Sequence, residues 1–179
     1  MPYDYAALFD RIHPGFFRQL RIRTLPPEDV YEEQVLFLKD YDPHAPAISA
    51  PAHITYGLYT GDHAALTEAV RSVDPDWVPF YHPEDRVFVA MDGERILSFC
   101  LLEDFGVHDG VKIGGPGCVG TVPAGRRQGI GLRMIQLATA QLKADGYDLS
   151  WIHYTGVGHW YARLGYQTVL RWNANGFCD

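Results

Sequence analysis

The chain has 179 residues, a formal net charge of −7 and a sequence pI of about 5.5, with 47% hydrophobic and 21% charged residues. That length and composition suit one globular domain with a buried core. An acidic surface repels phosphate backbones, which excludes nucleic acid as the expected partner and favours cationic ligands. The three cysteines, Cys100, Cys118 and Cys178, are too scattered for a disulfide framework or a paired-cysteine metal site. The N-terminus has no long apolar run, so we expect a cytoplasmic protein with neither signal peptide nor membrane span.

The first 85 residues alternate between periodic segments and segments rich in proline. A helix start is clearest at Pro26-Pro27-Glu28-Asp29, because proline in the first turn and acids near the positive end of the helix dipole are both favourable. That helix would carry Glu28, Glu32 and Glu33 on a solvated face. In chain order we expect a helix over 4–12, a strand over 19–24, a helix over 26–39, a loop over 40–60, a helix over 62–73 and a loop over 74–85.

From residue 86 onward, strands and helices alternate. The Gly93-Glu94 pair indicates a hairpin turn, and several glycines in the strand that follows indicate a close approach by another backbone or a ligand. This order predicts a mixed sheet with helices packed on it, an α/β fold. We expect strands over 86–92 and 95–102, a loop over 103–110, a strand over 111–122, a helix over 129–144, a strand over 149–154, a helix over 159–164 and a strand over 166–172.

The segment from Val119 to Gly131 joins the glycine-rich strand to the longest predicted helix. A helix N-terminus offers unpaired N–H groups and a partial positive charge, which together bind pyrophosphate. Gly129 and Gly131 would let phosphate oxygens approach the backbone, and Arg126 and Arg127 add charge. Walker and Rossmann loops fit worse, because the lysine of the first and the third glycine of the second are missing. A plain connecting turn is the alternative, but two arginines at this helix end are unfavourable without an anion.

This segment resembles a known family. Arg126-x-x-Gly129-x-Gly131, with a proline three residues before the arginine, is similar to the Q/R-x-x-G-x-G/A motif of the GNAT acyltransferase superfamily. The run Trp160-Tyr161-Ala-Arg-Leu-Gly165-Tyr166 resembles the end of that family's later helix, and Arg21 to Asp29 resembles its first strand and helix start. The resemblance covers residues 19–172. It implies one acyltransferase domain over 1–179, with an N-terminal extension over 1–18.

The resemblance also implies a GNAT-like, mixed, mostly antiparallel central sheet with flanking helices, in which strands 111–122 and 148–154 run parallel and splay apart. Acetyl-CoA would be the co-substrate, with its pantetheine arm in the gap between those strands. One contact departs from the family, because Tyr154 stands where many members carry asparagine. The residues expected to bind the coenzyme are Val119, Gly120, Thr121, Arg126, Arg127, Gln128, Gly129, Ile130, Gly131 and Tyr154.

For the chemistry, the resemblance implies direct attack of an amine on the thioester. Tyr161 would give a proton to the leaving thiolate, unless it is only a core aromatic, and a backbone N–H near Val119 would stabilise the oxyanion. The general base is not given by the resemblance, because 114–117 has no carboxylate where some members carry glutamate. A water chain, or an amine that binds already neutral, would also serve. The candidate side chains are His153, which ranks first because its strand borders the thioester, then Glu103, Asp104 and His108.

We therefore expect an N-acetyltransferase that moves acetyl from acetyl-CoA to a primary amine, carried by a cationic small molecule or a protein. The alternative is a non-catalytic acyl-CoA-binding or sensing module, which the missing strand carboxylate favours slightly. The eight histidines make no ligand pattern with cysteine, so no metal is expected. Cys118 is interpreted as a small strand residue and not as a nucleophile. Asn173 to Asp179 would either pair in a homodimer or form a loose tail.

Overall fold

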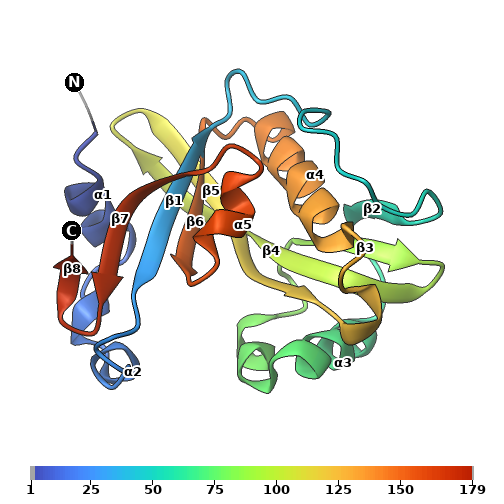
Figure 1. The fold of residues 1–179 in the computed structure, drawn as a ribbon, viewed down its shortest axis with the longest axis horizontal. Coiled ribbons are helices and arrows are strands. Elements are labelled where there is room, and N and C mark those ends of the chain that lie inside the picture. Colours follow the sequence, from blue (N-terminus) through green and yellow to red (C-terminus); the bar gives the residue numbers. More distant parts are fainter. Residues whose placement is uncertain (1–2, 179) are drawn as a thin grey trace.

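The computed structural model describes residues 3–178 and contains an eight-stranded sheet in the order β2-β3-β4-β5-β6-β1-β7-β8 (Figure 1). Every neighbouring pair is antiparallel except β5 and β6, so the expected mixed, mostly antiparallel sheet with flanking helices is confirmed. The elements in chain order are α1 (Tyr5–Ile12), η1 (Phe16–Arg18), α2 (Leu20–Arg23), β1 (Tyr31–Phe37), β2 (Thr55–Leu58), α3 (His63–Val73), η2 (Pro75–Phe80), β3 (Val87–Asp92), β4 (Arg95–His108), β5 (Val111–Thr121), η3 (Pro123–Gly125), α4 (Ile130–Ala144), β6 (Leu149–Thr155), α5 (Gly158–Ala162), β7 (Gln167–Asn173) and β8 (Gly176–Cys178).

The helix expected over 4–12 is confirmed as α1, but the next two elements differ from the sequence prediction. Residues 19–24 form the short helix α2 and not a strand, and the expected helix over 26–39 is a short turn followed by the strand β1. The match of 21–29 to the first strand and helix start of the GNAT family is therefore wrong. Helix-start signals at Pro26 and Asp29 act locally, whereas β1 is held by strands more than a hundred residues away, so tertiary pairing overrides local propensity.

Strand β1 lies between β6 and β7 and pairs antiparallel with both. The first strand of the chain thus fills a slot between two of the last strands, as Figure 1 shows. The helices α1 and α2 and the turn η1 cover the face of the sheet beneath this slot. Their apolar residues join a core cluster of Leu8, Phe9, Phe16, Ile22, Val35, Ile113, Leu149, Trp151 and Trp172.

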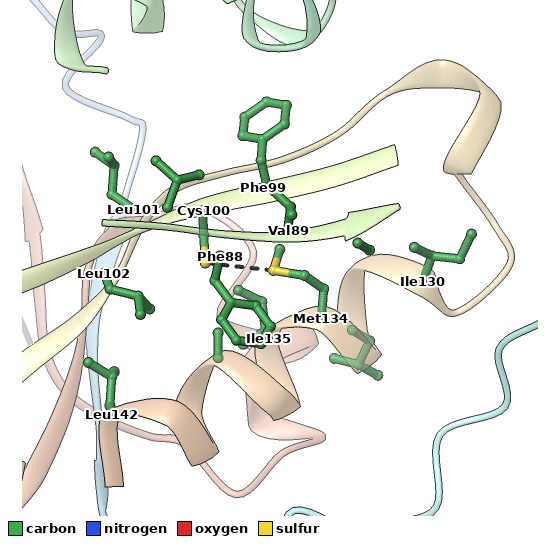
Figure 2. Close-up of a cluster of buried hydrophobic side chains, with 14 of the residues drawn as sticks. Phe88, Val89, Phe99, Cys100, Leu101, Leu102, Ile130, Met134, Ile135 and Leu142 are labelled. Atoms are coloured by element: carbon green, nitrogen blue, oxygen red, sulfur yellow. Dashed lines mark hydrogen bonds between the residues drawn. The ribbon is translucent and has the colours of Figure 1, made fainter. Parts of the chain in front are cut away.

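Helix α4 packs on the opposite face of the sheet. Figure 2 shows Phe88, Cys100 and Leu102 pointing toward this helix, where the Cys100 sulfur lies 3.6 Å from that of Met134, while Phe99 and Leu101 point away. Alternate residues of β6 follow the same division. Trp151 belongs to the N-terminal cluster, whereas Ile152 belongs to the α4 cluster. The sheet therefore has an α4 face and an N-terminal face.

Three further segments differ from expectation. Residues 103–108 continue β4 instead of forming a loop, because the tight turn lies at Asp109-Gly110, where both residues have positive φ angles of 53° and 81°. The expected loop over 40–60 contains the strand β2 at its end. The expectation of a loose tail over 173–179 is wrong for its described part, since Gly176–Cys178 pairs back on β7 as an edge strand, while Asp179 lies outside the described residues.

Strands β5 and β6 run parallel, as expected, and pair only at Ile113 with Leu149 and Gly114 with Ser150. Both strands continue well beyond these pairs, so they part in the middle of the sheet. At the point of parting, a Cβ on Gly115 would overlap the carbonyl of Trp151, which means that only glycine permits this approach. Within residues 3–178, no helix is long and apolar enough to cross a membrane.

Candidate functional site

A cavity of about 1150 Å³ lies between the end of β5, the start of α4 and the short helix α5. This volume exceeds that of most small-molecule pockets and suits a long ligand. The cavity takes one wall from each of these three elements and a fourth from a proline-rich segment. Its lining residues are Ala47, Ile48, Ser49, Val119, Thr121, Gly125, Arg126, Arg127, Gln128, Gly129, Ile130, Gly131, Leu132, Val157, His159, Trp160, Tyr161 and Arg163.

The N-terminus of α4 opens into this cavity. Gly129 is the N-cap residue with a φ of 76°, and no side chain caps the helix, so its first N–H groups keep their hydrogen-bonding capacity. A Cβ on Gly131 would lie 2.5 Å from Oγ1 of Thr121, so glycine lets the helix pack directly on β5. Free amides, the helix dipole and missing side chains together make a place where a pyrophosphate fits.

Two arginines add positive charge at this helix end. Arg126 and Arg127 are exposed, and neither forms an ion pair with any carboxylate of residues 3–178. The Nε of Arg126 donates to the carbonyl of Thr121 over 3.0 Å, which holds the side chain beside the strand end. Uncompensated cations at the positive end of a helix are favourable only when an anion joins them.

The fourth wall is a segment whose position beside α4 no sequence pattern predicts. Arg133 and Gln136 of α4 donate to the carbonyls of Pro43 and Pro46 over 2.7 and 2.8 Å. These bonds hold the segment along α4, and the Ser49 carbonyl comes so close to Gly129 that a Cβ there would overlap it. A loop thus becomes a fixed part of the cavity through bonds to one helix.

Tyr161 reaches the cavity from α5 and is 5% exposed. Its ring packs against Trp160 and Tyr166, with centroids 4.9 and 6.1 Å away. Burial raises the pKa of its phenol well above the usual value, with smaller contributions from Cys100 and Tyr166. The hydroxyl is therefore protonated at neutral pH and available as a proton donor.

His153 lies on the N-terminal face, opposite the face that Tyr161 covers. Its Nδ1 is 3.0 Å from both carboxylate oxygens of Glu33, whose side chain is fully buried. The same carboxylate accepts hydrogen bonds from Nε1 of Trp151 (2.6 Å), Nε1 of Trp172 (2.8 Å) and the amide of Tyr154 (3.1 Å). Because indole and amide nitrogens can only donate, Glu33 acts as an acceptor throughout, and His153 Nδ1 donates to it. The Nε2 of His153 is left as the free proton acceptor.

A β-bulge produces this arrangement. On β6, Glu32 of β1 pairs with Thr155 and Gln34 pairs with Ile152, so two residues of β6 face Glu33 alone. Tyr154 has a φ of 58°, in the left-handed region, as the bulge requires. The interpretation of Glu33 as part of a solvated helix face is thus wrong, and no local signal would have revealed its partners.

The imidazole ring of His13 stacks on the imidazole ring of His153, with centroids 3.9 Å apart and planes 19° from parallel. Its Nε2 is buried and has no hydrogen-bond partner among the described residues. Burial, then the neighbouring His153 and Arg21, lower the pKa of His13 to about 3. His13 is therefore uncharged at neutral pH and packs against His153 as an aromatic ring.

The structure brings most of the expected coenzyme residues to one cavity, but not all of them. Gly120 is a buried strand residue whose carbonyl accepts from Ser98 Oγ over 2.7 Å, and Tyr154 packs against Trp172 on the N-terminal face. His153 is likewise outside the cavity lining. The residues that do line it are Val119, Thr121, Arg126, Arg127, Gln128, Gly129, Ile130, Gly131 and Tyr161.

The remaining candidate bases lie apart from one another. Asp104 is exposed and accepts from the amide of Gly106, and His108 lies at the far end of β4, where Nε2 contacts the Phe105 carbonyl. Glu103 is partly buried on β4. Burial raises the pKa of Cys118 to about 12, with Glu103 and Asp74 adding to the shift and Arg21 opposing it, so its thiol is protonated. Over residues 3–178, no group of three His, Cys, Asp or Glu side chains is placed to hold a metal ion.

Comparison with known proteins gives a consistent result. A family model described as an acetyltransferase (GNAT) domain matches residues 83–168. Among curated proteins, no match to the chain is found. Similar solved structures include the GCN5-related glucosamine N-acetyltransferase region of a fungal multi-domain GH3 β-N-acetylglucosaminidase, with 22% identity and a TM-score of 0.66 over 80% of this chain.

Two further similar structures are GCN5-related N-acetyltransferases, from Sphaerobacter thermophilus and Kribbella flavida. They share 20% and 24% identity with this chain, cover 88% and 87% of it, and give TM-scores of 0.60 and 0.55. The matched regions span 20%, 54% and 60% of the lengths of the fungal, Sphaerobacter and Kribbella chains. At these identities the likeness establishes the fold.

The low pKa of His13 predicts a pH dependence of stability. The unfolded chain protonates this histidine near its ordinary value of 6.5, whereas the folded protein does so only near 3. Stability is therefore fully present above pH 6.5 and falls as the pH drops toward 3, by less than about 1.4 kcal/mol per pH unit. Urea unfolding at pH 7, 6 and 5 measures this slope. His13→Phe should flatten it, while the exposed His44→Phe should keep it; equal slopes in all three proteins would contradict the assignment.

Proposed function

The chain belongs to the GNAT acetyltransferase superfamily through residues 83–168, and we propose that it transfers an acetyl group from acetyl-CoA to a primary amine. One observation carries this proposal: a single cavity joins the edge of β5, the free N-terminus of α4 and the phenol of Tyr161. A pyrophosphate suits the helix end, and an extended pantetheine arm suits the backbone of β5 near Val119 and Thr121. Bound acetyl-CoA would supply the acetyl group as a thioester.

The chain's own residues would handle the protons. His153 Nε2 takes a proton from the amine nitrogen, which then forms a bond to the acyl carbon while the carbon–sulfur bond breaks. Tyr161 gives its phenolic proton to the departing sulfur and is reprotonated from solvent. Glu33 does not touch the reacting atoms and is a positioning residue, because it holds His153 in the tautomer with Nε2 free.

The separation of β5 and β6 supports these separate roles for Tyr161 as proton donor and His153 as base. Tyr161 and His153 lie on opposite faces of the sheet, and the two strands part beyond Gly114 and Ser150. An amine bound on the N-terminal face would reach the thioester through this gap. A backbone N–H near Val119 would then stabilise the oxyanion.

The acceptor class is proposed from charge and from one relative. The net charge of −7 favours a cationic acceptor, of a small molecule or a protein, over nucleic acid. One similar structure is described as a glucosamine N-acetyltransferase region, so an amino sugar belongs in the first set of amines to test. The free Cys100, Cys118 and Cys178 fit a reducing, cytoplasmic location. A homodimer and the lack of a membrane partner stay predictions.

The alternative is a module that binds acyl-CoA without turnover, and the absence of a carboxylate over 114–117 favours it. Calorimetric titration with acetyl-CoA and CoA, followed by thiol release with a panel of amines, separates the two. We expect binding of both coenzymes and release with at least one amine. Binding with no release across the panel would support the sensing module.

The coenzyme cradle makes its own prediction. Arg126→Ala/Arg127→Ala should weaken CoA binding by about tenfold or more, because charge-assisted hydrogen bonds contribute roughly 1.5–3 kcal/mol. The matched control is Arg95→Ala, since Arg95 pairs with Asp92 beside the Gly93-Glu94 turn, outside the cavity lining. Calorimetry compares the three proteins. Unchanged affinity in the double variant, or no affinity in the wild type, would remove the pyrophosphate assignment.

Tyr161→Phe tests the proton donor. It should lower kcat by roughly 10²- to 10⁴-fold while leaving the Kd for CoA within about twofold, because only the phenolic proton is lost. Tyr166→Phe is the control, since its hydroxyl bonds Ser150 (2.7 Å) and Thr139 (2.9 Å) and supports the core. That variant should mainly lower the free energy of unfolding, with a smaller effect on kcat. Full turnover by Tyr161→Phe would take this residue out of the mechanism.

His153→Gln tests the base. We expect kcat/KM to fall by roughly 10²- to 10⁴-fold and its rise with pH to disappear, because the neutral imidazole is the active form. Glu33→Gln should shift the same limb of the profile without removing the base. His108→Gln, on the distant β4 turn, should behave as wild type. A pH profile of unchanged shape in His153→Gln would rule out His153 as the base.

A further inference from the structure

Glu103 carries a carboxylate that has no partner within residues 3–178. The residue is partly buried on β4, and no described residue donates a hydrogen bond to it or forms an ion pair with it. Neither of its carboxylate oxygens is fully buried, so solvent still reaches both of them. A carboxylate held partly out of water without a cation costs free energy that a bound cation would offset.

The carboxylate lies in the space that a side chain at Gly117 would fill. Glu103 faces Gly115 across the β4–β5 ladder, and its side chain leans along β5 so that a Cβ on Gly117 would overlap its Oε2. Glycine at 117 is therefore a condition for this placement. The glycine-rich stretch of β5 carries no acid of its own, yet an acid from the neighbouring strand covers it.

Glu103 and His153 share one face of the sheet. Leu101 points away from α4 in Figure 2, and Glu103, two residues further along β4, has the same orientation. His153 is two residues beyond Trp151, whose carbonyl abuts Gly115. The two side chains thus lie on either side of the gap where β5 and β6 part.

The charges around Glu103 leave room for a cation. Burial raises the pKa of Glu103, a nearby His153 lowers it, and Asp85 raises it further. On the N-terminal face, the titratable groups around His153 include Glu33 of β1, Tyr154 of β6 and His13 after α1, with Arg21 of α2 next to His13. None of these gives Glu103 a fixed positive partner.

We propose that Glu103 binds the ammonium group of the acceptor on the N-terminal face and presents it to Nε2 of His153. This inference rests on the proposed acetyltransferase function and narrows its acceptor to primary alkylammonium compounds. Glu103 stays a carboxylate throughout, and no bond to it forms or breaks. The ammonium nitrogen loses one proton to Nε2 of His153, which passes it to solvent, and loses a second proton by the same route as its bond to the acyl carbon forms. An uncharged alcohol of the same shape would lack the ion pair and bind weakly.

The test uses glucosamine, spermidine and a lysine-containing peptide as probes, with calorimetry of each on CoA-saturated protein beside steady-state kinetics. Glu103→Gln keeps the shape and removes the charge. It should raise the Kd and KM for the amine by about 10- to 100-fold while leaving the Kd for acetyl-CoA within about twofold. Glu94→Gln, in the exposed turn before β4, is the control and should match the wild type.

A second variant moves the carboxylate without changing its charge. Gly117→Ala would push Glu103 aside and should raise the amine KM as Glu103→Gln does, whereas Gly57→Ala, which meets no atom within 4 Å, should not. Equal amine affinity in wild type and Glu103→Gln would overturn the inference, as would a wild-type protein that binds none of the amines. Failure of the wild type to bind acetyl-CoA would instead overturn the proposed function itself.

Discussion

The buried carboxylate of Glu33 is the interaction on which the architecture depends. It sits in the middle of β1 and accepts hydrogen bonds from Trp151 and His153 on β6 and from Trp172 on β7. A fully buried carboxylate is tolerated only when its oxygens are satisfied, so these strands must meet at this register. The same bonds fix the ring of His153 and the bulge at Tyr154. The hydrogen bonds of Glu33 that join β1 to β6 and β7 therefore also orient the proposed base.

The two faces of the sheet carry different parts of the proposed reaction. On the α4 face lie the helix N-terminus, two arginines that pair with no carboxylate of the described chain, and the protonated Tyr161. On the N-terminal face lie His153 and, across the gap, Glu103. Opposite charges on opposite faces would keep an anionic coenzyme and a cationic acceptor from competing for the same surface. In the proposed function, the acceptor and the thioester would meet where β5 and β6 diverge, because the two strands pair only at Ile113 with Leu149 and Gly114 with Ser150.

Local signals predicted the second half of the chain well. The hairpin at Gly93, the strand over 111–122 and the helix over 129–144 are set by turn residues and periodicity close in sequence, and the structure has each of them. The helix over 4–12 was predicted correctly, but residues 19–39 were not, because Pro26 and Asp29 give helix-start signals while β1 is decided by pairing with residues 149–155 and 167–172. The cavity wall at 47–49 was missed for the same reason, since its partners on α4 lie about ninety residues further along the chain.

The glycines of β5 show how a sequence pattern can be interpreted in two opposite ways. Without a structure, the run over 114–117 looks like a strand that has lost its carboxylate. In the folded chain each missing side chain has a use. Gly115 admits the carbonyl of Trp151 where β6 departs, and Gly117 admits the carboxylate of Glu103. A residue larger than glycine at either position would close the gap or displace the acid. The carboxylate that β5 lacks is thus provided by β4, and the glycines of β5 leave the room for it. This is possible because neighbouring strands bring their side chains together on one face of a sheet.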